Sequence, residues 1–117
     1  ACSLTKDNTH LVDENLLSKM KSNAYVINVS RGPLIKEKAL IEAILNKQIK
    51  GAGLDVFEEE PLQINSKILE LSNCILGSHN SSNTIDAVKR VNKMTIDMVS
   101  HAKNNDVLNI FPERRVI

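Results

Sequence analysis

The sequence predicts an α/β fold, a parallel sheet with flanking helices. Short apolar segments alternate along the chain with longer amphipathic ones, and the apolar segments lack the strict alternation of a half-exposed strand. Such an order favours parallel strands joined by crossover helices. The length of 117 residues, with 42% hydrophobic and 25% charged residues, fits one small globular domain.

Three short apolar runs are predicted to be strands. They cover residues 24–28 (AYVIN), 52–56 (AGLDV) and 74–77 (CILG). Each run is brief and nearly continuous, which is typical of strands in a sheet that is covered on both faces. We therefore expect cover on both sides of this sheet. We also expect Cys2 and Cys74 to be buried, reduced thiols in strand-like surroundings.

Two helices are predicted before and between the strands. The first follows Asp13, whose side chain can cap it, and places Leu16, Leu17 and Met20 on one face. The second covers residues 36–48, where an amphipathic stripe is formed by Leu40, Ile41, Ile44 and Leu45. Each helix therefore has one apolar face with which to pack on the sheet.

The longest helix is predicted over residues 84–103. Asn83 followed by Asp86 resembles a capping box at its start. Its apolar face is formed by Ile85, Val88, Val91, Met98, Val99 and Ala102. Residues 104–117 have no clear period, so we interpret them as a tail that follows a domain ending at residue 103.

Composition argues against several classes of partner. The net charge is +1, with 15 basic and 14 acidic residues, and aromatic residues make up only 3% of the chain. Because nucleic-acid binding needs a basic surface or stacking aromatics, no nucleic acid partner is expected. No apolar run approaches the roughly 18 residues that indicate a membrane helix. Without such a run or a signal peptide, we expect a cytoplasmic protein with no membrane partner.

Chemically useful side chains follow each predicted strand. Arg31 comes after the first strand, a carboxylate cluster that ends at Glu60 after the second, and His79 after the third. Parallel strands end at one edge of a sheet, and the ligands of open α/β sheets bind beyond that edge. We therefore expect Arg31, Glu60 and His79 to converge there, although they are far apart in the sequence.

Each of these side chains has a plausible role in an acid–base site. Arg31 can hold a carboxylate with two hydrogen bonds, and His79 can exchange a proton near neutral pH. Glu60 beside the imidazole would orient the ring and stabilise its protonated form. Together they suit a 2-hydroxy acid that is anchored by its carboxylate and oxidised by hydride transfer to a nicotinamide. Taken singly, Arg31 also fits a solvated loop residue, and Glu58 and Glu59 fit surface charges, so the residues alone leave both interpretations open.

Four segments of the sequence resemble one known family. Residues 28–32 (NVSRG) are similar to the Asn-x-x-Arg-Gly segment of the D-isomer-specific 2-hydroxyacid dehydrogenases, and residues 51–61 (GAGLDVFEEEP) to their Gly-Ala-x-x-Asp-Val-Phe-x-x-Glu-Pro signature. Residues 78–84 (SHNSSNT) resemble their Pro-His-x-Gly-x-x-Thr segment, and residues 4–11 resemble the stretch that borders the nicotinamide. The four segments occur in the family's order and at its spacings.

The resemblance implies roles for particular residues. Arg31 is expected to anchor the substrate carboxylate, His79 to be the acid–base, and Glu60 to be its acidic partner. The implied cofactor is NAD, with NADP not excluded, and no metal is expected. Cofactor contacts are implied for Val29, Ser30, Arg31, Asp55, His79, Ser81 and Ser82, with Asp55 bonding the nicotinamide carboxamide. The implied substrate is a small 2-hydroxy or 2-keto acid, which includes a phosphoglycerate-like one.

The same resemblance implies how the chain is organised. Residues 1–103 would form the second half of a Rossmann-like dinucleotide-binding domain, and residues 104–117 would lead back toward a mostly absent substrate domain. No G-x-G-x-x-G segment for the pyrophosphate occurs in the chain. We therefore expect a fragment of a longer oxidoreductase, inactive by itself and homodimeric when intact.

Departures from the family pattern leave one alternative open. Ser78 stands where the family usually has Pro, and Asn80-Ser81 replace an apolar-Gly pair, which bears on backbone contacts with the carboxamide. The alternative is a non-catalytic, NAD-sensing protein-interaction module like the corepressors that resemble these dehydrogenases. Such a module can keep the Arg, Glu and His residues. A response-regulator-like module is disfavoured, because it would need an acidic pocket with a lysine.

Overall fold

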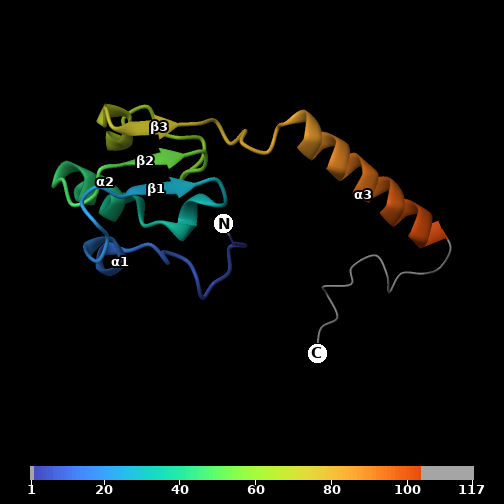
Figure 1. Ribbon diagram of the computed structural model, residues 1–117, viewed down its shortest axis with the longest axis horizontal. Helices are drawn as coiled ribbons and strands as arrows, with labels where there is room; N and C mark the ends of the chain where they lie inside the picture. Colours follow the sequence, from blue (N-terminus) through green and yellow to red (C-terminus); the bar gives the residue numbers. More distant parts are fainter. Residues whose placement is uncertain (1, 104–117) are drawn as a thin grey trace. The chain divides into compact units, whose positions relative to one another are not determined.

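The computed structural model describes residues 2–103, which fall into two compact units that divide between Ser81 and Ser82 (Figure 1). The first unit contains α1 (Glu14–Ser18), β1 (Tyr25–Asn28), α2 (Glu37–Leu45), β2 (Gly51–Leu54) and β3 (Cys74–Leu76). It also contains two short 3₁₀ helices that the sequence did not predict, η1 (Gly32–Leu34) and η2 (Lys67–Glu70). The second unit contains α3 (Ile85–Lys103). The predicted order of strands and α-helices is confirmed.

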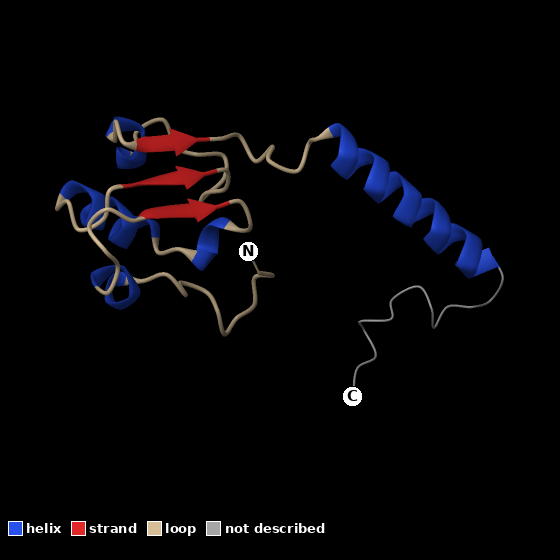
Figure 2. Cartoon of the chain, in the orientation of Figure 1, coloured by secondary structure: helices blue, strands red, loops and turns tan. Residues whose placement is uncertain are grey.

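The three strands form one parallel sheet in the order β1-β2-β3, as predicted (Figure 2). The register pairs Val26 with Ala52, and Ala52 with Cys74. β2 ends two residues before the predicted limit of residue 56. The chain turns there because the Phe57 N–H donates to a Glu60 carboxylate oxygen, at 2.9 Å, and has no strand partner.

One face of the sheet forms the hydrophobic core. Val26, Ala52 and Leu54 point to this face and pack in one buried cluster with Leu40 and other residues of α2. On the opposite face, Ile27 and Ile75 are 75% and 80% exposed. The prediction of a sheet covered on both faces is therefore wrong for the first unit, because its helices supply cover to one face only.

The two helices of the first unit are shorter than predicted. Asp13 caps α1 as expected, since its carboxylate accepts a hydrogen bond from the Leu16 N–H at 2.8 Å. Leu17 is fully buried, but Leu16 is exposed, so only part of the predicted apolar face meets the core. In α2 the buried residues are Ala39, Leu40, Ala43 and Ile44, whereas Leu45 is exposed. The face of α2 that packs in the core therefore differs from the predicted face, because it includes two alanines and leaves out Leu45.

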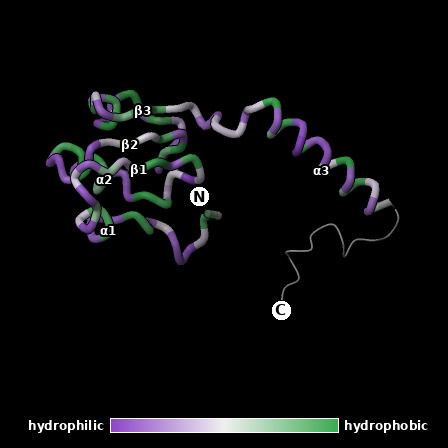
Figure 3. Tube along the Cα trace, viewed as in Figure 1, coloured by the Kyte–Doolittle hydropathy of each residue, from purple (hydrophilic) through white to green (hydrophobic). Residues whose placement is uncertain are grey.

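The second unit consists, among its described residues, of α3 and the turn before it. Figure 3 shows alternating hydrophobic and hydrophilic stretches along α3, as its predicted apolar face requires. The cap differs from the prediction: the Thr84 hydroxyl, and not Asn83, accepts the Ala87 N–H at 3.1 Å. Thr84 fits because it is the residue immediately before the helix. The predicted tail, residues 104–117, lies outside the described residues.

The cysteines only partly match their prediction. Both are free thiols, but Cys2 is exposed and Cys74 is half-buried. Cys2 is exposed because residues 2–5 run along the surface and are not part of a strand. Burial raises the pKa of the Cys74 thiol, which keeps it protonated. No helix within residues 2–103 is long and apolar enough to cross a membrane.

Candidate active site

The three loops expected to converge follow the three strands at one edge of the sheet. The arrows of β1, β2 and β3 point the same way in Figure 2, so the segments after Asn28, Leu54 and Leu76 leave at that edge. Backbone hydrogen bonds continue between these segments. The Asp55 N–H donates to the Asn28 carbonyl at 2.9 Å, and the His79 N–H donates to the Asp55 carbonyl at 2.8 Å. The three segments that carry the candidate residues are therefore joined to one another by backbone hydrogen bonds.

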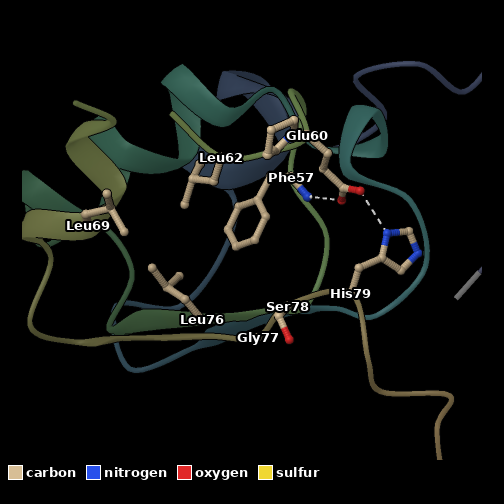
Figure 4. A pocket seen from close by; sticks show the side chains of 9 residues that line it. Phe57, Glu60, Leu62, Leu69, Leu76, Gly77, Ser78 and His79 are labelled. Atoms are coloured by element: carbon tan, nitrogen blue, oxygen red, sulfur yellow. Dashed lines mark hydrogen bonds and ion pairs between the residues drawn. The ribbon is translucent and has the colours of Figure 1, made fainter. Parts of the chain in front are cut away.

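His79 and Glu60 form the central pair of the site (Figure 4). The His79 Nδ1 atom lies 2.8 Å from Glu60 Oε2, and the other carboxylate oxygen, Oε1, accepts the Phe57 N–H. The Phe57 N–H, then the His79 ring and, more weakly, the charge of Arg31 lower the pKa of Glu60 below its ordinary value. An ionised Glu60 only accepts hydrogen bonds, so Nδ1 of His79 bears a proton and Nε2 is left for a reacting group.

Arg31 is held at the end of β1 by a buried amide. Asn28, which is only 6% exposed, donates to the Arg31 carbonyl at 2.9 Å and accepts the Ser30 N–H at 3.0 Å. The Arg31 side chain is exposed, and its Nη1 atom donates to the Ser30 carbonyl at 2.7 Å. Four of the five guanidinium N–H groups therefore remain for a ligand.

Gly32 allows the Arg31 loop to approach the Glu60 loop. A Cβ atom at Gly32 would lie 1.6 Å from the Phe57 carbonyl oxygen and 2.6 Å from the Glu58 backbone nitrogen. These neighbours are backbone atoms, which cannot rotate away as a flexible side chain can. The absence of a side chain at Gly32 is thus what brings the arginine and the carboxylate into one site.

The Gly32→Ala substitution is expected to destabilise the fold by about 3 kcal/mol, because the new methyl group overlaps backbone that must shift. Urea unfolding of the chain, followed by far-UV circular dichroism, measures this loss. Gly53→Ala is the matched control, since its Cβ would meet only Ile27 Cγ1, at 3.8 Å. Equal unfolding midpoints for the two variants would contradict the close approach at Gly32.

The residues expected to contact a cofactor are distributed around this edge. Val29, Ser30 and Arg31 line an open depression of about 620 Å³ together with Cys2, Ser3 and Leu4. Two of these residues are hydrogen-bonded to each other, because the Ser30 hydroxyl donates to the Cys2 carbonyl at 2.5 Å. Asp55 accepts the Ser81 N–H at 2.7 Å, so both lie beside His79. Ser82 begins the second unit and is not among the residues that the first unit brings together.

An apolar cavity lies beside the His79–Glu60 pair, and both residues contribute to its lining. Its volume is about 370 Å³, and Phe57, Leu62 and Leu76 form much of its wall (Figure 4). Figure 4 shows the cavity on the leucine side of the pair, whereas Nε2 of His79 faces the opposite way.

The comparison with known protein families decides the assignment. Residues 1–81 match the NAD binding domain of the D-isomer specific 2-hydroxyacid dehydrogenases. The chain belongs to this family. The family assignment and the α/β fold predicted from the sequence are both confirmed.

Named relatives of this chain support the same assignment. It is 38% identical, over 97% of its length, to a glyoxylate reductase of Thermofilum pendens, and covers 36% of that protein. It is 40% identical, over 89% of its length, to the glyoxylate/hydroxypyruvate reductase B of Enterobacter sp. (strain 638), and covers 32% of it. The chain thus spans about a third of the length of these relatives.

A solved structure of the family is also similar. The D-isomer specific 2-hydroxyacid dehydrogenase of Xanthobacter autotrophicus Py2, in complex with NADPH and MES, matches with a TM-score of 0.78 and 30% identity. The match covers 88% of this chain and 42% of that one. This chain therefore shares its fold with that protein.

Two residues of the candidate site were not predicted from the sequence. Asn28 organises the Arg31 loop, and the signal that could have found it is a lone amide at the end of a buried strand. Glu58, expected to be a surface charge, is structural: one carboxylate oxygen contacts His10 Nε2 at 2.5 Å and the other accepts the Glu37 N–H at 2.9 Å. Glu58 thereby caps α2, which has no side-chain cap of its own.

The lowered pKa of Glu60 predicts a pH dependence of stability. A carboxyl whose pKa is lowered by folding stabilises the fold above its unfolded value, near 4.5 here, and loses that contribution as the pH falls through the folded pKa. Glu60→Gln is therefore expected to reduce the loss of stability on acidification below pH 4.5. Urea unfolding midpoints at pH 6 and pH 3.5 test this, with the exposed Glu59→Gln as control. An acid sensitivity of Glu60→Gln equal to that of the wild type would contradict it.

No group of three or more His, Cys, Asp or Glu side chains in residues 2–103 is arranged to hold a metal ion. The acidic and imidazole groups of the site are instead paired with one another or with backbone N–H groups. The chemistry that these described residues offer is thus anion binding at Arg31 and proton transfer at His79.

Proposed function

We propose that this chain is the catalytic part of the NAD-binding domain of a dehydrogenase that reduces a small 2-keto acid, with glyoxylate and hydroxypyruvate as the first candidates. The observation that supports this most directly is the 2.8 Å contact between His79 Nδ1 and the ionised Glu60, which leaves Nε2 for the substrate. Membership of the family favours this substrate class, as does the similarity to a glyoxylate reductase and a glyoxylate/hydroxypyruvate reductase. A phosphoglycerate-like substrate is the alternative outcome of the assay below.

In the proposed reaction Arg31 binds the substrate carboxylate through its free guanidinium N–H groups. His79 donates the proton on Nε2 to the carbonyl oxygen of the 2-keto acid, and takes it back in the oxidative direction. Glu60 keeps the ring in the tautomer that this transfer needs and stabilises the protonated ring. The nicotinamide cofactor supplies the hydride that completes the reduction to the 2-hydroxy acid.

The residues around the sheet edge fit the nicotinamide end of such a cofactor. The depression beside Val29, Ser30 and Arg31 is open and partly apolar, and lies at the carboxyl end of β1, where dinucleotides bind in open α/β sheets. Asp55, Ser81 and Ser82 are proposed as further cofactor contacts, as the family signature implies. NAD is proposed as the cofactor and NADP is the alternative, since the related structure contains NADPH.

A steady-state assay of the protein that contains this chain tests the proposal. The expected result is oxidation of NADH, followed at 340 nm, with glyoxylate or hydroxypyruvate and with little activity on a 2-keto acid esterified at its carboxylate. NADPH in place of NADH distinguishes the cofactors, and size-exclusion chromatography tests the predicted homodimer. Binding of NADH with no turnover of any 2-keto acid would instead favour the NAD-sensing module.

A further inference from the structure

Asp55 holds the loop that carries His79 at two points. Its carbonyl oxygen accepts the His79 N–H at 2.8 Å, and its carboxylate atom Oδ2 accepts the Ser81 N–H at 2.7 Å. The two hydrogen bonds lie on either side of the histidine side chain along the loop. Asp55 therefore fixes both the position where the backbone enters His79 and the position where it leaves the turn.

The backbone of His79 needs such support. Its φ angle is +57°, in the left-handed region that is unfavourable for a non-glycine residue. A residue in this region persists only where its surroundings determine its conformation. Burial does not do so here, because the His79 side chain is 49% exposed. The bonds to Asp55 and the side-chain contact with Glu60 are what remain to hold it.

The absence of a side chain at Gly77 leaves the space that the Asp55 carboxylate occupies. A Cβ atom at Gly77 would lie 2.2 Å from Asp55 Oδ1 and 3.3 Å from Asp55 Cα. The carboxylate thus rests directly on the glycine backbone, which any side chain would prevent. The N–H groups of Asn80 and Ser81 lower the pKa of Asp55 below its ordinary value, so the group is ionised in the neutral range.

We propose that Asp55, seated on Gly77, is the positioning residue of His79: it holds residues 79–81 so that the ring meets Glu60 at Nδ1 and presents Nε2 to the substrate. This inference rests on the proposed acid–base role of His79. It also assigns Asp55 a role that does not need the cofactor, because Oδ2 is already engaged by the protein's own backbone.

Four variants separate this role from simple cofactor binding. Asp55→Ala removes the acceptor, whereas Asp55→Asn keeps a carbonyl oxygen for the Ser81 N–H. Gly77→Ala leaves Asp55 chemically intact but displaces its carboxylate. Gly53→Ala is the matched glycine control, because its Cβ would make only an ordinary contact with Ile27. Three of the variants therefore change the contact between the Asp55 carboxylate and the Ser81 N–H, and the fourth leaves it unchanged.

The first readout is hydrogen exchange of the Ser81 amide, measured by NMR on this chain, with the Val26 and Gly53 amides of the sheet as the internal test of folding. Exchange at Ser81 is expected to accelerate at least tenfold in Asp55→Ala and Gly77→Ala, less in Asp55→Asn, and not in Gly53→Ala. The second readout is kinetic. A misplaced His79 should lower kcat about 100-fold in Asp55→Ala and Gly77→Ala, with a smaller change in the Kd for NADH.

Two results would overturn the proposal. One is Ser81 exchange within twofold of the wild type in both Asp55→Ala and Gly77→Ala. The other is an unchanged kcat with a weakened Kd for NADH, which would make Asp55 a cofactor ligand only. If Asp55→Ala does not fold, Asp55→Asn and Gly77→Ala still give both readouts. Failure of the proposed function is distinguishable, because it would appear as retained activity in a His79 variant, whatever the Ser81 exchange.

Discussion

His79→Asn is expected to lower kcat for 2-keto acid reduction by about 10²–10⁴-fold, the usual contribution of general acid–base catalysis. Asparagine suits this test because it tolerates the left-handed backbone at this position better than other residues do. Its side chain can also donate a hydrogen bond to Glu60. The variant therefore removes the transferable proton while leaving the loop and its neighbours in place.

Steady-state kinetics and the Kd for NADH together measure this effect. The Kd should change little, since the imidazole acts on the substrate carbonyl. His101→Asn is the matched control: that residue lies in α3, where its ring Nδ1–H donates to the Asp97 carbonyl. Wild-type kcat in His79→Asn, or an equal loss in His101→Asn, would reject the acid–base role.

Arg31→Gln is expected to lower kcat/KM for the keto acid by about 10³-fold, mainly through KM. Two hydrogen bonds between charged groups contribute roughly 1.5–3 kcal/mol each, and about 4 kcal/mol in total corresponds to this factor. Arg31→Lys should recover only part of the loss, because an ammonium group keeps the charge but lacks the planar fork of the guanidinium.

The comparison needs a control for lost charge at the surface. Lys21→Gln provides it, because Lys21 is exposed and precedes β1, whereas Arg31 follows that strand. Its kcat/KM should equal that of the wild type. Restored activity of Arg31→Gln toward an uncharged ester of the keto acid would support the carboxylate contact. A KM within threefold of the wild-type value for Arg31→Gln would contradict it.

The sequence predicted the sheet and the central pair because both depend on local patterns. Short apolar runs locate strands, and the rule that parallel strands end at one edge places His79 near Glu60. It could not predict which helix residues meet the core: Leu16 and Leu45 are exposed, because the packed face depends on where each helix lies on the sheet. The roles of Arg31, Glu60 and His79 stay predictions that the variants test.

The close contacts across the site were also beyond the sequence. Gly32 meets the Phe57 backbone and Gly77 meets Asp55, at separations of more than 20 residues along the chain. A glycine in a sequence indicates backbone freedom, but it does not name the group that will occupy the space beside it. Glu58 lies at the surface as expected, but its contacts with His10 and Glu37 could not be predicted, because these partners are distant in sequence.

The contact between Glu60 and Nδ1 leaves His79 with a single ring nitrogen, Nε2, for proton exchange. Because Nδ1 is hydrogen-bonded to the carboxylate, the proposed proton transfer to the substrate takes place at Nε2. Reprotonation of the ring by water must take place at the same atom. A bound substrate occupies that position, so the ring cannot be reprotonated until the product has left. The half-exposed side chain then meets solvent directly. Each turnover would thus begin with a ring that has already taken its proton from water, and a solvent isotope effect on the reprotonation step would follow product release.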